Sequence, residues 1–209
     1  MRCEHDHKQS TREKILLAAL DLIGREGVQQ VTTRKIAAAA EVNVAAVNYY
    51  FGSKDNVINE ALVILTNRLT KSFCCLEDVS LEPEERLRRF LYSYAEATLE
   101  HADIFRNFMH QMTNYGEVTF EYREFMRRVG WETLKVVLRD ITGIEADSVL
   151  NMKIFQLFSS LEFPVLLGEQ MRELCTFDYE NPGDRRQYVE LLLVSLIQPQ
   201  KIALSRKEA

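Results

Sequence analysis

Residues 32–51, TTRKIAAAAEVNVAAVNYYF, constrain the fold more than any other part of the chain. Thr32 and Asn43 are both residue types that cap helix N-termini, so the segment predicts two short helices separated by the turn EVN. A helix of about two turns is unstable alone and needs a partner. The small alanines between Ile36 and Ala46 allow the two helices to cross closely. The sequence therefore predicts a helix-turn-helix.

Helical periodicity extends along the rest of the chain, and few residues interrupt it. Only 8 glycines and 4 prolines occur in 209 residues, as is typical of a helical protein. An apolar stripe predicts a first helix at 10–26, which Gly27 would end. Pro83 suits the first turn of a helix, and Pro164 would kink one. The other expected helices span about 54–74, 84–101, 103–115, 118–142, 147–173 and 184–198.

Composition excludes several classes of protein. With 46% hydrophobic residues the chain can form a core, and no stretch of 18 apolar residues predicts a membrane span. The polar N-terminus lacks the apolar region of a secretion signal, so the expected location is the cytoplasm. The four cysteines show no metal-ligand spacing and are expected to be thiols. Cys3, His5 and His7 leave open a metal-chelating tail, but a disordered tail is the more common outcome for such a pattern.

The net charge of −5 is unevenly distributed. Residues 1–55 contain 8 Lys/Arg and 7 Asp/Glu, whereas the remainder contains 18 and 24. A mildly positive head on an acidic body is compatible with DNA binding by the head, although the asymmetry alone is weak evidence.

The third predicted helix, VAAVNYYF, has the residue types of a helix that reads the major groove. Such a helix presents its N-terminal residues to base edges. Val44, Ala45 and Ala46 are small enough for close approach, and their methyl groups can contact thymine methyls. Asn48 can form a bidentate hydrogen bond with an adenine edge. We therefore expect Val44, Ala45, Ala46 and Asn48 to specify sequence.

Phosphate contacts are expected around this helix. Tyr49 and Tyr50 can donate hydroxyl hydrogen bonds to phosphates, while Phe51 turns inward, because one helix face cannot bury three consecutive rings. Lys54 adds a charge at a helix N-terminus, which favours an anion. Thr33 can bind a phosphate, and Arg34 a phosphate or a guanine edge.

The strings VTTRKIAAAAEVN, VAAVNYYF and GSKD together resemble the DNA-binding domain of bacterial TetR-family transcriptional regulators over residues 10–62. The family pattern is V-T-x-R-x-I-A-x-x-A, a turn, an aromatic pair, Phe, and a small residue before Ser/Asn-Lys. The resemblance implies DNA contacts at Thr33, Arg34, Val44, Ala45, Ala46, Asn48, Tyr49, Tyr50 and Lys54.

Two positions depart from the family's habit. Glu41 stands in the turn where the family often has glycine, so a tighter or strained turn is expected there. Asn48 stands where many members carry tyrosine, which favours base reading over a phosphate contact at this position.

The C-terminal body contains two segments that are apolar nearly all round, 154–168 and 191–197. Such helices need burial on more than one side, either inside their own domain or against a second subunit. Since TetR-family bodies dimerise, the resemblance favours a homodimer in which the helices at about 147–173 and 184–198 of each subunit form a four-helix interface.

Aromatic and methionine side chains crowd the body, with a few polar groups among them. Such a stripe is more often core than pocket, but an apolar cavity with polar anchors is typical of a small-molecule site, and the family implies one. The expected effector is apolar or aromatic. The candidate pocket residues are Phe105, Phe108, Met109, Met112, Phe125, Trp131, Phe158 and Glu162.

The predicted architecture is all-α, with a three-helix helix-turn-helix domain at 9–62 (the motif itself at about 33–52) and a larger effector-binding and dimerisation domain at 63–209. The resemblance implies a homodimeric repressor of a palindromic operator that a small molecule releases. An architectural or division-control DNA binder of the same fold remains an alternative. No nucleophile elbow or glycine-rich phosphate loop supports an enzyme, and no cofactor or metal is expected.

Overall fold

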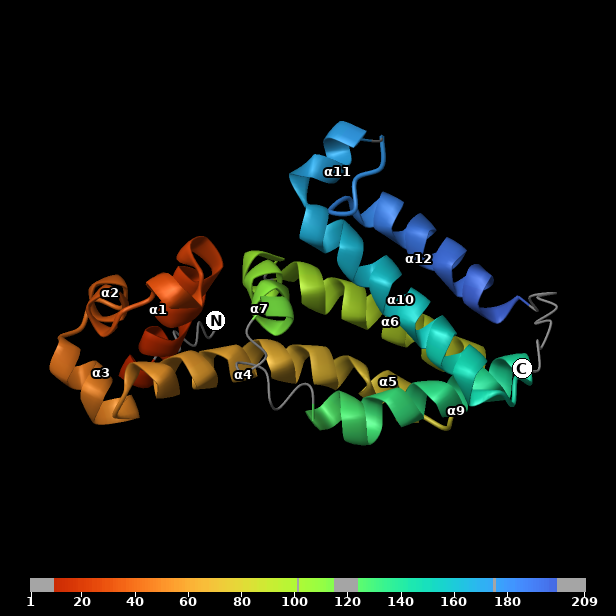
Figure 1. Cartoon of the computed structure of the whole chain (residues 1–209), viewed down its shortest axis with the longest axis horizontal. Helices are drawn as coiled ribbons and strands as arrows, with labels where there is room; N and C mark the ends of the chain where they lie inside the picture. The colour runs from red at the N-terminus through yellow and green to blue at the C-terminus, as the bar shows by residue number, and fades with distance from the viewer. Residues whose placement is uncertain (1–9, 101, 115–123, 175, 199–209) are drawn as a thin grey trace, which may run out of the picture. The chain divides into compact units, whose positions relative to one another are not determined.

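The computed structural model describes residues 10–100, 102–114, 124–174 and 176–198. Within these ranges the side chains at 108, 110–114, 171, 172 and 174 are also outside the description. All regular elements of the described residues are helical (Figure 1). The predicted all-α fold class is confirmed. The proposed chelating tail, with Cys3, His5 and His7, lies outside the described residues, and no group of metal-ligating side chains occurs inside them.

The described chain divides into two compact units. The first contains residues 1–72 and 96–127, and the second contains residues 73–95 and 128–209. The helix α6 (Pro83–Glu100) therefore contributes residues to both. These units are defined by packing, and their boundaries differ from the predicted domain boundary at residue 62, which falls inside α4 (Lys54–Ser72). That predicted boundary separates DNA-binding residues from the rest by function and stays a prediction.

The first unit is built on α1 (Thr11–Glu26), which packs against α2 (Thr33–Ala39), α4 (Lys54–Ser72) and α7 (Ala102–Asn114). A 3-10 turn (Val28–Gln30) connects α1 to α2, and α3 (Val44–Phe51) joins α2 to α4 (Figure 1). The apolar stripe that predicted this helix is its buried face, which consists of Ile15, Leu16, Ala19, Leu20 and Ile23.

The contact between α1 and α7 depends on a glycine. A Cβ at Gly24 would lie 3.2 Å from Ile104 Cγ1 and 3.3 Å from Asp103 Cβ, so the missing side chain lets α7 approach. Asn107 Nδ2 then donates to the Gly24 carbonyl at 2.9 Å. Because of this contact, α7 packs on the same unit as the helix-turn-helix.

The second unit contains α5 (Cys74–Glu77), the first part of α6, α9 (Trp131–Thr142), α10 (Asp147–Leu167), α11 (Glu169–Leu174) and α12 (Pro182–Ile197). A π-helical turn (Met126–Gly130) leads into α9, and the boundary between the units falls inside it. Its core includes Leu134, Leu157, Leu161 and Leu193, all nearly inaccessible to solvent. The helices α10 and α12 pack against each other (Figure 1).

Two predicted helix bounds are corrected. Of the helix expected at 118–142, residues 124–142 are described and are helical, with the π-helical turn leading into α9. The helix expected at 147–173 ends at Leu167, because Gly168 adopts a φ of 53° and donates to the Pro164 carbonyl. The last helix begins at Pro182, earlier than predicted, because Asn181 Oδ1 accepts from Gly183 N–H at 2.8 Å and Asp184 N–H at 3.2 Å.

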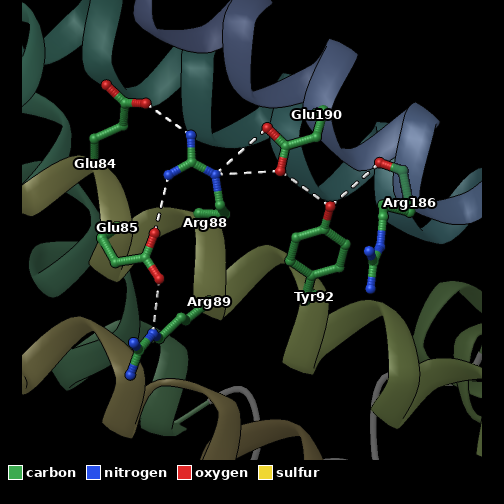
Figure 2. A network of polar contacts seen from close by, with 7 residues as sticks. All are labelled: Glu84, Glu85, Arg88, Arg89, Tyr92, Arg186 and Glu190. Atoms are coloured by element: carbon green, nitrogen blue, oxygen red, sulfur yellow. Dashed lines mark hydrogen bonds and ion pairs between the residues drawn. The ribbon is translucent and has the colours of Figure 1, made fainter.

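A polar network joins α6 to α12 (Figure 2). The Arg88 guanidinium lies 2.8 Å from Glu84, 3.0 Å from Glu85 and 3.2 Å from Glu190. The Tyr92 hydroxyl donates to Glu190 at 3.0 Å, which extends the network along α12. Hydrogen bonds to its carboxylate partners, Glu85 first, raise the pKa of Arg88.

No helix in the described ranges is both long enough and apolar enough to cross a membrane.

Candidate nucleic-acid interface

Capping residues at both ends define α3. Asn43 Oδ1 accepts from the Ala46 N–H at 2.6 Å. Gly52, at a φ of 75°, donates its N–H to the Asn48 carbonyl at 2.8 Å. Thr32 likewise caps α2, since its hydroxyl accepts from the Lys35 N–H at 3.2 Å. The helix-turn-helix predicted from these capping residues is confirmed.

The inner face of α3 is fixed by apolar contacts and one cation. Val47 is 1% exposed and Phe51 is 5% exposed. The Arg12 guanidinium of α1 lies 5.2 Å from the centroid of the Phe51 ring and also pairs with Glu60 of α4. Phe51 therefore points inward, as predicted. The role of Arg12 was not predicted, because nothing in its local sequence points to a ring 39 residues away.

The outer face of α3 carries the predicted reading residues. Val44, Ala45 and Asn48 are exposed, and Ala46 is half-buried at the edge of this face. Tyr49 is 83% exposed and Tyr50 is 42% exposed. Exposed large rings are unusual on a globular surface and indicate a contact surface.

The two tyrosine rings support each other. Their centroids lie 5.2 Å apart with an interplanar angle of 81°, an edge-to-face arrangement that aromatic pairs prefer. This contact restricts the rings, so their hydroxyls are partly positioned before any DNA binds.

Two cations near α3 are available to a phosphate. Arg34 is exposed at the first turn of α2, beside the half-buried Thr33, and Lys54 is the first residue of α4. Within the described residues neither Arg34 nor Lys54 has an acidic partner. Lys35, in contrast, is held by Glu26 at 2.5 Å and by the Gln30 carbonyl at 3.1 Å. The motif thus leaves free the two charges that a phosphate contact requires.

The turn between α2 and α3 is strained at Glu41. This residue has a φ of 55°, a left-handed conformation that side chains other than glycine disfavour, and it is the non-glycine residue with positive φ among those described. The Val42 N–H still reaches the Ala37 carbonyl at 2.9 Å, so the turn is closed. The expectation of a strained turn at Glu41 is confirmed.

Comparison with known proteins agrees with this geometry. Residues 15–61 match the family model described as "Bacterial regulatory proteins, tetR family". Residues 15–61 are therefore similar to the DNA-binding domain of TetR-family regulators. TetR-family members are transcription regulators rather than enzymes, and they bind DNA and dimerise.

Individual relatives extend the likeness beyond the motif. The chain is 24% identical over 203 residues to "Probable HTH-type transcriptional regulator YttP" of Bacillus subtilis (strain 168), covering 94% of this chain and 82% of the relative. A local match to the "HTH-type transcriptional dual regulator CecR" of Shigella flexneri is 43% identical over 49 residues, which is 23% of this chain and 22% of CecR.

Solved structures confirm the fold over most of the chain. A HlyIIR mutant has a TM-score of 0.69 at 23% identity, covering 90% of this chain and 98% of that one. PfmR, a TetR-family regulator from Thermus thermophilus, has a TM-score of 0.67 at 22% identity, covering 86% of this chain and 96% of that one.

The predicted pocket residues are divided between the two units. Phe105 is fully buried in the first unit, which also contains the half-buried Met109 and Phe125. Trp131, Phe158 and Glu162 belong to the second unit. The side chains of Phe108 and Met112 lie outside the described part of the structure.

Within the second unit the structure brings Trp131, Phe158 and Glu162 together through Tyr94. The Trp131 and Phe158 rings stack with centroids 6.2 Å apart, and the Tyr94 ring lies 5.3 Å from that of Phe158. The Tyr94 hydroxyl donates to Glu162 at 2.8 Å. Tyr94 was absent from the predicted site. Its position four residues after the buried Phe90, on the same helix face, was the signal that could have found it.

Proposed function

We propose that the chain is a homodimeric repressor that binds a palindromic operator and is released from it by a small-molecule effector. The observation that carries the DNA-binding part is the exposed face of α3, where Ala45, Asn48 and Tyr49 project and where Arg34 and Lys54 lack acidic partners among the described residues. On this proposal residues 9–62 bind DNA and residues 63–209 dimerise and bind the effector. A DNA partner also places the protein in the cytoplasm.

Roles on the DNA follow from side-chain chemistry. Asn48 would read an adenine edge, and the methyl groups of Val44, Ala45 and Ala46 would lie against thymine methyls. Tyr49, Tyr50, Thr33, Arg34 and Lys54 would hold the phosphate backbone and fix the position of α3 in the groove. Two copies of α3 would reach successive major grooves about 34 Å apart.

An exposed apolar face on α10 and α12 supports the homodimer. Its members are large apolar side chains that remain 44–70% exposed in the single chain: Met152, Phe155, Phe163, Leu191 and Val194. Because α10 and α12 pack together, these side chains lie on neighbouring helices, as a four-helix interface between two copies requires. The face therefore supports the predicted use of these helices, with α10 now ending at Leu167.

Footprinting the purified protein on DNA around its own gene tests the proposal. We expect one or a few protected sites with two-fold symmetry. Absence of any sequence-selective protection would overturn sequence-specific binding. Many strong sites spread across a chromosome, rather than a few at promoters, would instead favour an architectural DNA binder.

A further inference from the structure

Two adjacent cysteines, Cys74 and Cys75, begin α5, one residue after the end of α4 (Figure 1). Cys74 is exposed, Cys75 is half-buried, and both are free thiols. The helix α5 packs against α9, whereas the proposed dimer face lies on α10 and α12. The pair of thiols is therefore separate from the surface that a second copy would cover.

Apolar side chains on either side hold this turn in place. Phe73 is 2% exposed, and the centroid of its ring lies 4.8 Å from that of Phe90 in an edge-to-face pair. Leu76 is 1% exposed, and its carbonyl accepts from Arg86 Nη1 at 3.2 Å. Because Phe73 and Leu76 both turn inward, the two cysteines between them are carried on the outer side of the turn.

The surroundings of Cys75 favour the neutral thiol. Burial raises the pKa of Cys75 above its ordinary value of 9.0, and the neighbouring Cys74 raises it further. Arg89 acts in the opposite direction, but its guanidinium also pairs with Glu85 at 2.9 Å. Oxidation by peroxide requires a thiolate, so the environment of Cys75 disfavours this kind of sensing.

A disulfide between the two cysteines is also disfavoured. Adjacent Cα atoms are about 3.8 Å apart across a trans peptide, whereas a disulfide normally joins Cα atoms about 4.4–6.8 Å apart. Successive side chains of a helical turn also diverge by about 100°. One atom inserted between the sulfurs would span this divergence. Because α5 is a single helical turn, its backbone can adjust more easily than that of a long helix.

The bridging atom must be soft and must accept two sulfurs at a narrow angle. Cysteine sulfur selects soft partners. Zinc normally takes four ligands, and within the described residues no group of three metal-ligating side chains exists to complete such a site. A linear two-coordinate metal would place its sulfurs on opposite sides, which neighbouring side chains of one turn do not match. Trivalent arsenic with one carbon substituent is pyramidal and offers two adjacent positions to sulfur.

We propose that Cys74 and Cys75 together bind a trivalent organoarsenical that carries one carbon substituent, with one bond from arsenic to each sulfur. In its hydrated form, R–As(OH)2, the arsenical has two hydroxyl groups. Each thiol forms an As–S bond as an As–OH bond breaks, and the thiol proton leaves with the hydroxyl as water. The reaction releases two waters, changes no oxidation state and needs no further reagent. It goes beyond the proposed function and requires neither DNA nor an effector.

Intact-mass spectrometry of the reduced full-length protein with phenylarsine oxide, which hydrates to this form, tests the site. We expect an adduct that survives a large excess of glutathione and is removed by 2,3-dimercaptopropanol, because a dithiol competes with two As–S bonds and a monothiol does not. Diphenylchloroarsine has one leaving group, so glutathione should remove its adduct. Equal removal of both adducts by glutathione would overturn bridging by two sulfurs.

Serine variants locate the two sulfurs. Cys74→Ser changes an exposed side chain by one atom and should reduce the fraction of protein that keeps the phenylarsine oxide adduct in glutathione at least tenfold, as should Cys75→Ser. The double variant Cys3→Ser/Cys175→Ser leaves only the proposed pair of the four cysteines and should keep the adduct in full. An adduct retained in Cys74→Ser, or lost in the double variant, would refute the assignment to this pair.

Discussion

Replacing Glu162 with glutamine should stabilise the protein at high pH and much less at low pH. The carboxyl has an ordinary pKa of 4.5, and burial raises its pKa in the folded protein to about 7. The folded state therefore holds this proton more tightly than the unfolded chain does. The resulting stabilisation is fully present below pH 4.5 and is lost as pH rises through 7.

The magnitude follows from the two pKa values. A tenfold change in a protonation equilibrium is worth about 1.4 kcal/mol, so the full effect of moving from 4.5 to about 7 is about 3 kcal/mol. About 2.5 kcal/mol of it falls between pH 5 and pH 8. Glutamine does not titrate and can still accept the Tyr94 hydroxyl. The unfolding free energy of Glu162→Gln minus that of the parent should therefore rise by about 2.5 kcal/mol over this range.

Urea unfolding followed by circular dichroism at pH 5 and pH 8 measures this difference. Protein concentration is held constant because dimerisation would contribute to stability. Using the difference between two variants cancels the titration of all other groups. Glu169→Gln shows whether removing any negative charge gives the same trend. A Glu162→Gln difference that does not change between pH 5 and pH 8 would refute the burial of this carboxylate.

Three further predictions concern other parts of the molecule. Arg88→Ala should lower the unfolding free energy by about 1–2 kcal/mol, because it removes three carboxylate contacts. Arg89→Ala loses one exposed contact and should lower it by less than about 1 kcal/mol, so equal losses in urea unfolding would contradict a network centred on Arg88. Glu41→Gly should raise the unfolding free energy by about 0.5–1 kcal/mol, because glycine adopts the left-handed conformation without strain. Glu41→Gln removes only the charge and should leave the unfolding free energy unchanged. An equal increase in unfolding free energy for both variants would attribute the effect to charge. Phe155→Glu should shift sedimentation toward the monomer, and Val79→Glu, at an exposed position outside the α10–α12 face, should not; an unchanged Phe155→Glu dimer would refute that face as the interface.

Local signals explain why the helix-turn-helix could be predicted from sequence. Thr32, Asn43 and Gly52 each fix a helix end through contacts within five residues, so their type and spacing determine the local structure. Phe51 could be placed inside because three consecutive rings cannot share one helix face. Glu41 was recognised by its departure from the glycine that the TetR family often has in this turn, and its φ of 55° explains that habit.

Contacts between distant helices could not be predicted in this way. The hydrogen bond from Tyr94 to Glu162 joins residues 68 positions apart, and the Arg88–Glu190 pair joins residues 102 apart. Helical periodicity shows which face of a helix is apolar, but not which helix it meets or at what rotation. The packing of α7 on α1 was missed for the same reason, because Gly24 looks like any other small residue inside a helix until Asn107 lies against it.

Asn48→Ala and Lys54→Ala, compared on the footprinted operator and on random DNA, test most directly that α3 reads sequence. Lys54→Ala should weaken binding to both DNAs equally. It should also reduce the slope of the logarithm of the binding constant against the logarithm of salt concentration by about one. Asn48→Ala should weaken operator binding by about 1–3 kcal/mol and leave random DNA unaffected. Equal losses on both DNAs for Asn48→Ala would contradict base reading by this face of α3.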